Sequence, residues 1–451
     1  MMDASHKLNH EPNAVQATNS AGFMVNENIA EAVRRKIPER VTNVKGTGAY
    51  GTFIVTQDIT KYSKAKIFAE VGNQCRVFVR FSAMHAEKGT CDSDRDVRGF
   101  ALKFYTEEGN WDLAGNNMPV FFVKDATNFP GLMRSQGRDF HTNMKSATAM
   151  WDFYSLHPET LHQLLMLMSD RGTPSGYRHM HGFGTHTFSM INARNERFWV
   201  KFHFKAKQGI KNLKSENIVK SDFAHEDLVK AIETKNFPKW SLYIQVMTQE
   251  QVKNSRWNPF DVTKVWLHDE FPLIEVGELE LNEIPKDYFT HVEQAAFSPA
   301  NIIPGIGFSP DRLLQARLFS YTDAQRHRVG INAKELAVNQ SSAKNSVQHF
   351  EDEVRNAATA NLTNIYENED DHYTQPGLFY TKALNAEQRE TMIQNIVEAM
   401  RDISGPTKHV VINRQLCHFF RANIELGMKI ATGLQVNIDA NMMSHSFTAG
   451  N

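Results

Sequence analysis

The feature that most limits how this chain folds is a set of short segments rich in β-branched and aromatic residues. The first group comprises Thr52–Thr56, Val77–Phe81, Phe100–Tyr105 and Pro119–Val123. A second group lies near 186–205 and a third at Trp240–Val246, with helical spacing at 148–168 and 226–235 between the groups. Runs of strands with helices between them predict an antiparallel α+β barrel or sandwich, and not a doubly wound parallel sheet.

Changes in composition divide the chain into four predicted parts. Residues 1–35 are polar and without pattern, as in an N-terminal arm, and residues 36–284 hold the predicted barrel or sandwich with its inserted helices. Residues 285–345 begin with a long irregular stretch containing four prolines, which predicts a segment that is functional or wraps a neighbour. Residues 346–451 form a predicted helical domain, because Ala386–Ile403, Arg414–Ala422 and Asn423–Leu434 show helical spacing.

Composition excludes several classes of function. Fifty basic and fifty-one acidic residues leave a net charge of −1, so no overall field attracts nucleic acid or an acidic membrane. No apolar run approaches the ~18 residues of a transmembrane helix. The three cysteines form no CxxC pair, and the first ten residues lack the pattern of a signal peptide. These features predict a cytoplasmic protein without a disulfide framework.

A glycine-rich motif at Gly46–Gly51 matches the GxGxxG fingerprint of dinucleotide-binding folds. That fingerprint requires a helix directly after it, whose N-terminus holds the pyrophosphate. A strand-like segment, Thr52–Thr56, follows instead. We therefore interpret the motif as a glycine-rich bend in a sheet.

Two further patterns concern a bound iron group. On a helix, Arg317, Tyr321 and Arg328 share one face, and neighbouring cations stabilise a phenolate, which is a known axial ligand of haem iron. Taken alone, this segment is equally consistent with a surface tyrosine beside solvated arginines.

Three histidines at 179, 181 and 186 lack a carboxylate or cysteine that would complete a metal site, so we expect structural or cofactor-edge roles, the latter for His186.

A series of longer motifs carries a family resemblance. In chain order, these are Pro38–Val41, Gly48–Gly51, Val79–Ser82, Asp96–Tyr105, Asn110–Asn117, Phe297–Asn301 and Arg317–Tyr321. The series resembles the monofunctional haem catalase family over about residues 30–435. The segment Asp370–Gly377 is similar to the small-subunit bacterial branch.

The resemblance implies a haem b enzyme that acts on hydrogen peroxide, with a β-barrel core, a wrapping segment, a helical C-terminal domain and a homotetrameric assembly. It makes Tyr321 the iron ligand and Arg317 its charge partner. It places Arg40, Arg80 and Arg328 at the haem carboxylates, Phe129 against the porphyrin, and Asn116 as an amide on the peroxide side. It also implies an NADPH site formed by His162, Ser169, Arg171, Lys205, Val265, Trp266 and His268, although Leu267 interrupts the usual motif there.

The sequence departs from the family at the catalytic base. Asn43 stands where the family has a histidine, and Ser82 and Asn116 are the other two predicted catalytic residues. Heterolysis of the peroxide O–O bond requires one oxygen to lose a proton and the other to gain it, and imidazole moves protons near neutral pH whereas a carboxamide does not. Loss of such a group typically costs about 10²–10⁴ in rate, so we expect weak or redirected dismutation.

Three neighbours of this position also depart from the family pattern. Thr42 is similar to the threonine of allene oxide synthases of the same fold, and Met84 is predicted to line or narrow the approach to the haem. Strand alternation places Arg80, Ser82 and Met84 on one face and His85 on the other, which argues against His85 as a substitute base. Two alternatives remain: an isomerase or peroxygenase of organic hydroperoxides, and a non-catalytic haem-binding homologue.

Overall fold

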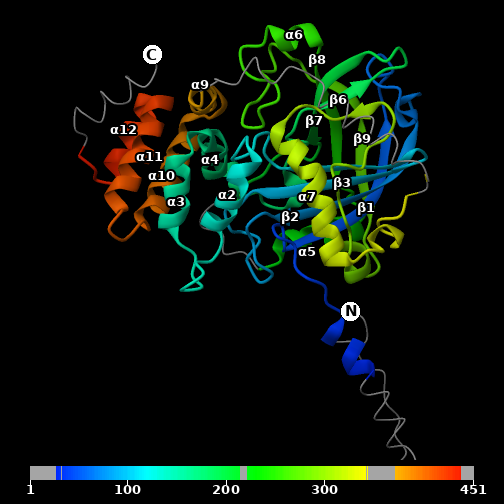
Figure 1. Ribbon diagram of the computed structural model, residues 1–451, viewed down its shortest axis with the longest axis horizontal. Coiled ribbons are helices and arrows are strands. Elements are labelled where there is room, and N and C mark those ends of the chain that lie inside the picture. Colours follow the sequence, from blue (N-terminus) through cyan, green and yellow to red (C-terminus); the bar gives the residue numbers. More distant parts are fainter. Residues whose placement is uncertain (1–26, 32, 214–220, 342, 344–370, 438–451) are drawn as a thin grey trace, which may run out of the picture. The chain divides into compact units, whose positions relative to one another are not determined.

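The computed structural model describes residues 27–31, 33–213, 221–341, 343 and 371–437. The chain divides into two units, residues 1–39 and 40–451. In the first unit, the described residues form helical turns up to residue 34. Most of the predicted arm, residues 1–35, and the start of the predicted C-terminal domain therefore lie outside the described residues. The second unit contains every element named below (Figure 1).

The second unit is built on a closed antiparallel barrel, as predicted. Its strands are β1 (Gly46–Val55), β2 (Gln74–Ala83), β3 (Arg98–Thr106), β4 (Gly109–Asn116), β5 (Gly182–Phe183), β7 (Arg197–Ala206), β8 (Lys239–Met247) and β9 (Ile274–Glu283). They pair in the order β7-β5-β4-β3-β2-β1-β9-β8, and β8 pairs with β7 to close the ring. Two short strands, β6 (Phe188–Ile191) and β10 (Ile306–Gly307), extend the sheet from β7.

The inward faces of the strands form an aromatic core. Phe53, Phe81, Phe100, Phe104 and Trp111 are at most 1% exposed. The rings of Phe104 on β3 and Trp111 on β4 stack with centroids 4.4 Å apart. Burying one such side chain contributes about 1.5–3 kcal/mol, so the many phenylalanines serve in large part to fill the barrel.

The glycine motif of β1 lies within a strand, which excludes the dinucleotide-binding interpretation. A Cβ on Gly51 would lie 1.9 Å from the carbonyl oxygen of Glu280 on β9, and a Cβ on Gly46 would lie 2.3 Å from that of Phe81 on β2. The pairing with β9 shifts register between Tyr50 and Gly51. The glycines therefore permit close strand contacts and a bulge, in place of the predicted bend.

Two strand predictions differ from the structure. Pro119–Val123 is not a strand, although Val120, Phe122 and Val123 are fully buried. Proline lacks the N–H that a ladder needs, and this apolar run packs against helices instead. The true neighbour of β3 is β4, at Gly109–Asn116, and β9 was not predicted at all.

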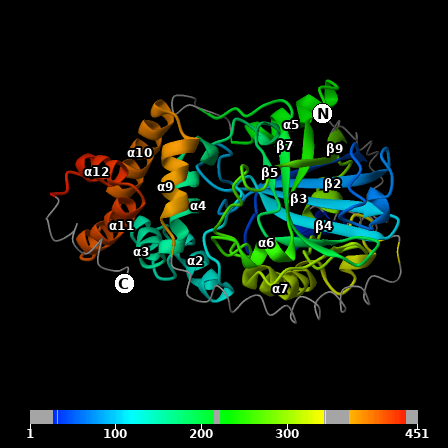
Figure 2. The ribbon, with the colours of Figure 1, turned by 90° about the horizontal axis from the view of Figure 1, so that it is seen from above.

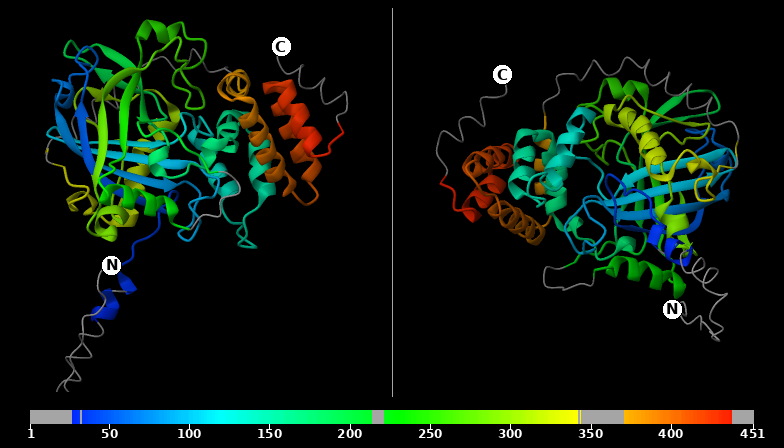
Figure 3. Two further views of the ribbon diagram at one scale, coloured as in Figure 1. Left: turned by 180° about the vertical axis from the view of Figure 1, so that it is seen from behind. Right: turned by 60° about the horizontal axis from the view of Figure 1, so that its bottom comes forward.

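Helices α2–α4 and α9–α12 gather at one side of the barrel, whereas α5, α6 and α7 lie at other places around it (Figures 1, 2 and 3). Those inserted between strands are α2 (Phe129–Gln136), α3 (Ala147–Leu156), α4 (Leu161–Met168), α5 (Phe223–Glu233) and α6 (Gln249–Lys253). The later ones are α7 (Arg312–Val329), α9 (Thr374–Leu378), α10 (Ala386–Arg401), α11 (Lys408–Ala422) and α12 (Ile424–Gly433). Helices α3, α4 and α10–α12 share a second apolar core, which confirms the predicted C-terminal helices. None of the helices in the described ranges is long and apolar enough to cross a membrane.

The segment between β9 and α7 is attached to the outside of the barrel through one buried carboxylate. Asp112 on β4 accepts hydrogen bonds from Lys103 Nζ at 2.8 and 2.7 Å, from the Ser298 N–H at 2.9 Å and from Asn301 Nδ2 at 2.8 Å. The segment therefore follows the barrel surface before α7 begins. The boundaries of the four predicted parts remain a prediction.

Candidate functional site

A cavity of about 420 Å³ lies between the barrel and α7. All the residues predicted for the haem site line it: Arg40, Asn43, Arg80, Ser82, Asn116, Phe129, His186, Arg317, Tyr321 and Arg328. They come from the segment before β1, from β2 and β4, from the start of α2, from the segment before β6, and from α7. The fold thus brings together residues that are up to 288 positions apart (40 to 328).

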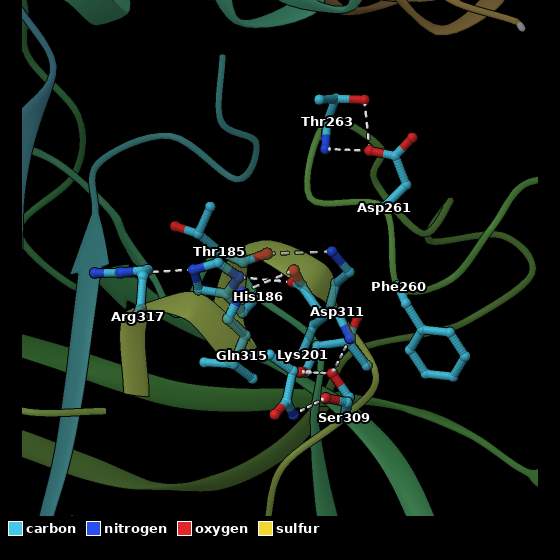
Figure 4. A network of polar contacts seen from close by, with 12 residues as sticks. Thr185, His186, Lys201, Phe260, Asp261, Thr263, Ser309, Asp311, Gln315 and Arg317 are labelled. Carbon is cyan, nitrogen blue, oxygen red and sulfur yellow. Dashed lines mark hydrogen bonds and ion pairs between the residues drawn. The ribbon is translucent and has the colours of Figure 1, made fainter. Parts of the chain in front are cut away.

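Tyr321 lies at the end of a chain of polar contacts that runs through Arg317, His186 and Asp311; Figure 4 shows the last three of these residues. Arg317 Nη2 donates to the Tyr321 hydroxyl oxygen at 2.6 Å, and Arg317 Nη1 donates to His186 Nε2 at 2.6 Å. His186 Nδ1 lies 2.6 Å from Asp311 Oδ2, and Asp311 Oδ1 accepts from the N–H of Leu314. The carboxylate that caps α7 therefore also orients the imidazole that holds Arg317.

This contact chain fixes the tautomer of His186. Because a guanidinium only donates, Nε2 must accept, so the ring proton is on Nδ1 and points to Asp311. Burial lowers the pKa of His186, which keeps the ring neutral. The sequence reasoning missed Asp311. An aspartate directly before the helical spacing of Arg312–Val329 is an N-cap signal that would have indicated it.

Three guanidiniums meet near a single carboxylate at another part of the cavity wall. Arg40 Nη1 lies 3.3 Å from Glu293 Oε1, and Arg328 Nη2 lies 3.0 Å from the same oxygen. Burial, with the charges of Arg80 and Arg328, lowers the pKa of Arg40 well below its usual value. Burial also lowers the pKa of Arg80, whose buried Nε has no hydrogen-bond partner among the described residues. Positive charge here exceeds negative charge, and a donor remains to be satisfied.

These features fit a flat group that carries two carboxylates. Three arginines with one glutamate leave two cations for two anionic groups, and the orphaned Nε of Arg80 is a ready donor. Phe129 and Phe121, whose rings stack at 6.4 Å, supply an aromatic wall, and the Tyr321 hydroxyl lines the same cavity as an oxygen suited to ferric iron. The residues present are therefore suited to haem b.

The carboxamide of Asn43 is held at both of its polar atoms. Asn43 Nδ2 donates to Ser82 Oγ at 2.9 Å, and Thr42 Oγ1 donates to Asn43 Oδ1 at 2.9 Å. The backbone of Asn43 has a φ of 60°, a left-handed conformation that asparagine and histidine adopt more readily than most residues. A Cβ on Gly99 would lie 2.3 Å from Ser82 Oγ and 2.8 Å from Asn43 Nδ2, so glycine is required at 99.

His85 lies away from Asn43. Met84 lines the cavity of Asn43, whereas His85 lines a neighbouring cavity of about 520 Å³. His85 Nδ1 lies 2.9 Å from Asp96 Oδ1, and its buried Nε2 has no partner among the described residues. Met84 and His85 therefore line different cavities, as predicted, but both lie in a bend beyond the end of β2 at Ala83 and strand alternation is not the cause.

A second cavity, of about 580 Å³, gathers the residues expected to bind NADPH. His162, Arg171, Lys205, Val265, Trp266 and His268 line it. Burial lowers the pKa of Lys205 to about 8 and also lowers that of Arg171, and neither cation pairs with a carboxylate in the described parts of the chain. Ser169 is not part of the wall, because its hydroxyl is buried and donates to the Met166 carbonyl.

The two cavities share one residue, Thr185. Its carbonyl accepts from Lys201 Nζ at 3.2 Å, and Lys201 lines the second cavity (Figure 4). Thr185 has a φ of 64°, which is strained for a β-branched residue. Lys201 and Leu267 are wall residues that the resemblance did not assign to the nucleotide site.

Comparison with known proteins identifies the family. Residues 3–374 match the family described as catalase, and residues 366–434 match one described as catalase-related immune-responsive. The chain is 48% identical to a catalase from an Onchocerca volvulus endobacterium, over 92% of this chain and 93% of that protein. It is 46% identical to a Staphylococcus aureus catalase, over 92% and 89%.

Solved structures agree with this match. A bacterial catalase superposes with a TM-score of 0.81 at 36% identity, covering 95% of this chain and 92% of that one. Catalase A from Saccharomyces cerevisiae gives 0.83 at 33% identity, covering 94% of each. The chain therefore belongs to the catalase family, which confirms the resemblance and makes the protein an oxidoreductase that acts on peroxide.

Proposed function

We propose that the chain is a haem-dependent enzyme that breaks down hydrogen peroxide, with dismutation slowed by Asn43. The observation that carries the proposal is the single cavity that joins Tyr321, a surplus of arginines and Asn43. The family match supplies the reaction class, and catalase-named relatives point to hydrogen peroxide as substrate.

We propose that residues on both sides of the cavity hold haem b. Tyr321 is the iron ligand, with Arg317 directing an N–H at its oxygen. Arg40, Arg80 and Arg328 pair with the two carboxylates, and Phe129 packs on the ring. When bound, the haem would supply an iron centre that gives two electrons to one peroxide and takes two from the next. His186 and Asp311 act by positioning Arg317.

The residues around Asn43 bind and orient peroxide. Asn116 lines the cavity, and its side chain makes no hydrogen bond within the described chain, so both ends of its amide are available. Ser82 Oγ accepts from Asn43, which leaves its own proton to donate. None of these three groups titrates near neutral pH, so no side chain there takes the peroxide proton as imidazole does. Proton transfer is then left to solvent, which is why the proposed rate is low.

Oxygen evolution from hydrogen peroxide by the haem-loaded protein tests the proposal. A low but haem-dependent rate supports it. Haem binding without any peroxide turnover would instead favour the non-catalytic haem-binding alternative, and a protein that takes up no haem would defeat the assignment of the cavity.

A second candidate is rearrangement or peroxygenation of an organic hydroperoxide. The observation that favours it is the hydroxyl of Thr42 bonded to Asn43, together with Met84 in the same wall. Such a reaction uses a carbon-bearing peroxide and releases no oxygen. Consumption of a fatty-acid hydroperoxide without oxygen evolution, faster than that of hydrogen peroxide, would select this candidate.

We further infer that NADPH binds in the second cavity. Two cations without carboxylate partners, Arg171 and Lys205, suit its phosphates, and Trp266 and Val265 offer apolar contact. Equilibrium titration with NADPH tests this assignment, and no binding at millimolar concentration would reject it.

Assembly and location are also inferences. We propose a homotetramer, supported by the family and by large exposed apolar side chains at Val41, Phe140 and Phe319. We propose a cytoplasmic location, supported by three free cysteines. Light scattering of the purified protein and fractionation of cells test the two statements.

A further inference from the structure

The hydrogen bonds of Asn43 determine which of its side-chain groups can donate a hydrogen bond to a ligand. Its Oδ1 receives the Thr42 hydroxyl, so that oxygen is already engaged as an acceptor. Its Nδ2 has two hydrogens, and Ser82 takes one of them. The remaining N–H is the polar group that Asn43 has free for a ligand. A flip of the amide would turn the nitrogen toward Thr42 and the oxygen toward Ser82, and both hydroxyls would then have to turn before they could bond again.

Thr42 is the residue that keeps the amide of Asn43 from turning. Ser82 alone does not fix the amide, because a hydroxyl is both donor and acceptor and pairs with either end. The Thr42 hydroxyl could in principle also pair with either end. In the structure, however, it donates to Oδ1 while Ser82 accepts from Nδ2, and the left-handed backbone of Asn43 holds the amide between them.

We propose that Thr42 is a positioning residue that holds Asn43 as a hydrogen-bond donor, so that this cavity binds small anions without taking up a proton. The proposal rests on the proposed function, since the ligand is expected to bind beside the haem. It implies that the peroxide form recognised here is the one that has already lost its proton.

The charges that face the cavity are compatible with an anion. Arg40 and Arg328 pair with Glu293 and, with Arg80, are assigned to the haem carboxylates, while Arg317 lies on α7 beside the buried pair His186 and Asp311. Among the described lining residues, none close to Asn43 in the sequence or on β2 is a carboxylate or an imidazole. His85, with Asp96, faces the neighbouring cavity.

Azide is a suitable probe, because it is ionised from pH 5.5 to 8 and its binding is followed by the haem absorption spectrum. For the haem-loaded wild type, we expect a dissociation constant that is unchanged within about twofold over this range. Asn43→His adds a proton acceptor, so binding should become coupled to proton uptake and weaken about tenfold per pH unit above the imidazole pKa. A wild type that shows the same steep dependence would overturn the proposal.

Variants at 42 separate positioning from packing. Thr42→Val keeps the shape and removes the donor, and azide affinity should fall about three- to tenfold, as for loss of one hydrogen bond. Thr42→Ser should restore it, and His85→Ala, in the other cavity, should leave it unchanged. If Thr42→Val bound azide as tightly as the wild type does, the positioning role of Thr42 would be contradicted.

A measurement on the apoprotein keeps this inference distinct from the proposed function. If the wild type takes up no haem, the proposed function fails. The hydrogen bond between Thr42 and Asn43 is then tested alone, by urea unfolding of Thr42→Val, Asn43→Ala and the double variant. Coupled residues give a double variant whose midpoint shift is smaller than the two single shifts combined. Additive shifts would show that Thr42 does not hold Asn43.

Discussion

Arg317 donates a hydrogen bond to the hydroxyl oxygen of Tyr321 across 2.6 Å, one turn away on α7. The guanidinium also lies over the Tyr321 ring, with its central carbon 4.8 Å from the centroid. A cation in this position stabilises the oxygen when it carries negative charge, which is the form that binds ferric iron. Its other contact, with His186, keeps the guanidinium in place.

Tyr321→Phe should abolish haem binding or remove the absorption band of phenolate-to-iron charge transfer, because the ligand oxygen is gone. Tyr243→Phe, which removes a phenol on β8, is the matched control and should keep the wild-type spectrum. Absorption spectra after reconstitution with haem measure both. An unchanged spectrum for Tyr321→Phe would show that another group binds the iron.

Asp112→Asn should destabilise the protein by about 3–5 kcal/mol, because it leaves the buried ammonium of Lys103 without its charge partner. It also weakens the attachment of Ser298 and Asn301 to β4. Glu107→Gln removes an exposed ion pair with Lys66 and should cost at most about 1 kcal/mol. Urea unfolding monitors both, and equal losses would refute the importance of the buried pair.

NADPH affinity should fall as the pH rises through about 8. Burial, aided by the charge of Arg171, lowers the pKa of Lys205 to about 8, so the free cavity loses a cation above that pH. Phosphate binding prefers the protonated lysine, so affinity is highest below pH 8. Fluorescence titration at pH 6.5, 8 and 9.5 measures this dependence.

Substitution at the same lysine tests that explanation. Lys205→Gln should weaken NADPH binding about 10- to 100-fold at pH 6.5, as for a hydrogen bond to a charged group, and should flatten the pH profile. Lys207→Gln changes an exposed lysine paired with Glu278 and should have little effect. A steep pH profile that persists in Lys205→Gln would assign the titration to another group, such as Lys201.

Local sequence patterns predicted the features that depend on neighbouring residues, namely the faces of strands and the bounds of helices. The alternation of β2 correctly placed Arg80 and Ser82 on the cavity side. Met84 and His85 follow the end of β2 at Ala83, so their separation into two cavities comes from the bend after the strand. Helical spacing predicted α10 and α12 closely. It did not predict the first turns of α11, where the β-branched run Val410–Ile412 is more typical of a strand than of a helix.

Contacts between distant segments were out of reach of pattern alone. Pro119–Val123 has strand composition but packs against helices, since tertiary burial outweighs propensity there. The pairing of His186 with Asp311 joins positions 125 residues apart, and no local signal states it. The nucleotide cavity came only from the family resemblance, and Ser169 shows that a matching residue can face elsewhere.

The measurement that tests the central claim most directly is oxygen evolution from hydrogen peroxide by the haem-loaded wild type and by Asn43→His. Histidine tolerates the left-handed backbone at 43, and Ser82 remains to accept its ring N–H. The double variant Thr42→Val, Asn43→His also removes the Thr42 hydroxyl, which would otherwise hydrogen-bond the new imidazole. We predict a rise of about 10²–10⁴ in rate for the better of the two variants, as expected of a positioned acid–base group. A wild type that already dismutates peroxide at a rate neither variant improves would contradict the account.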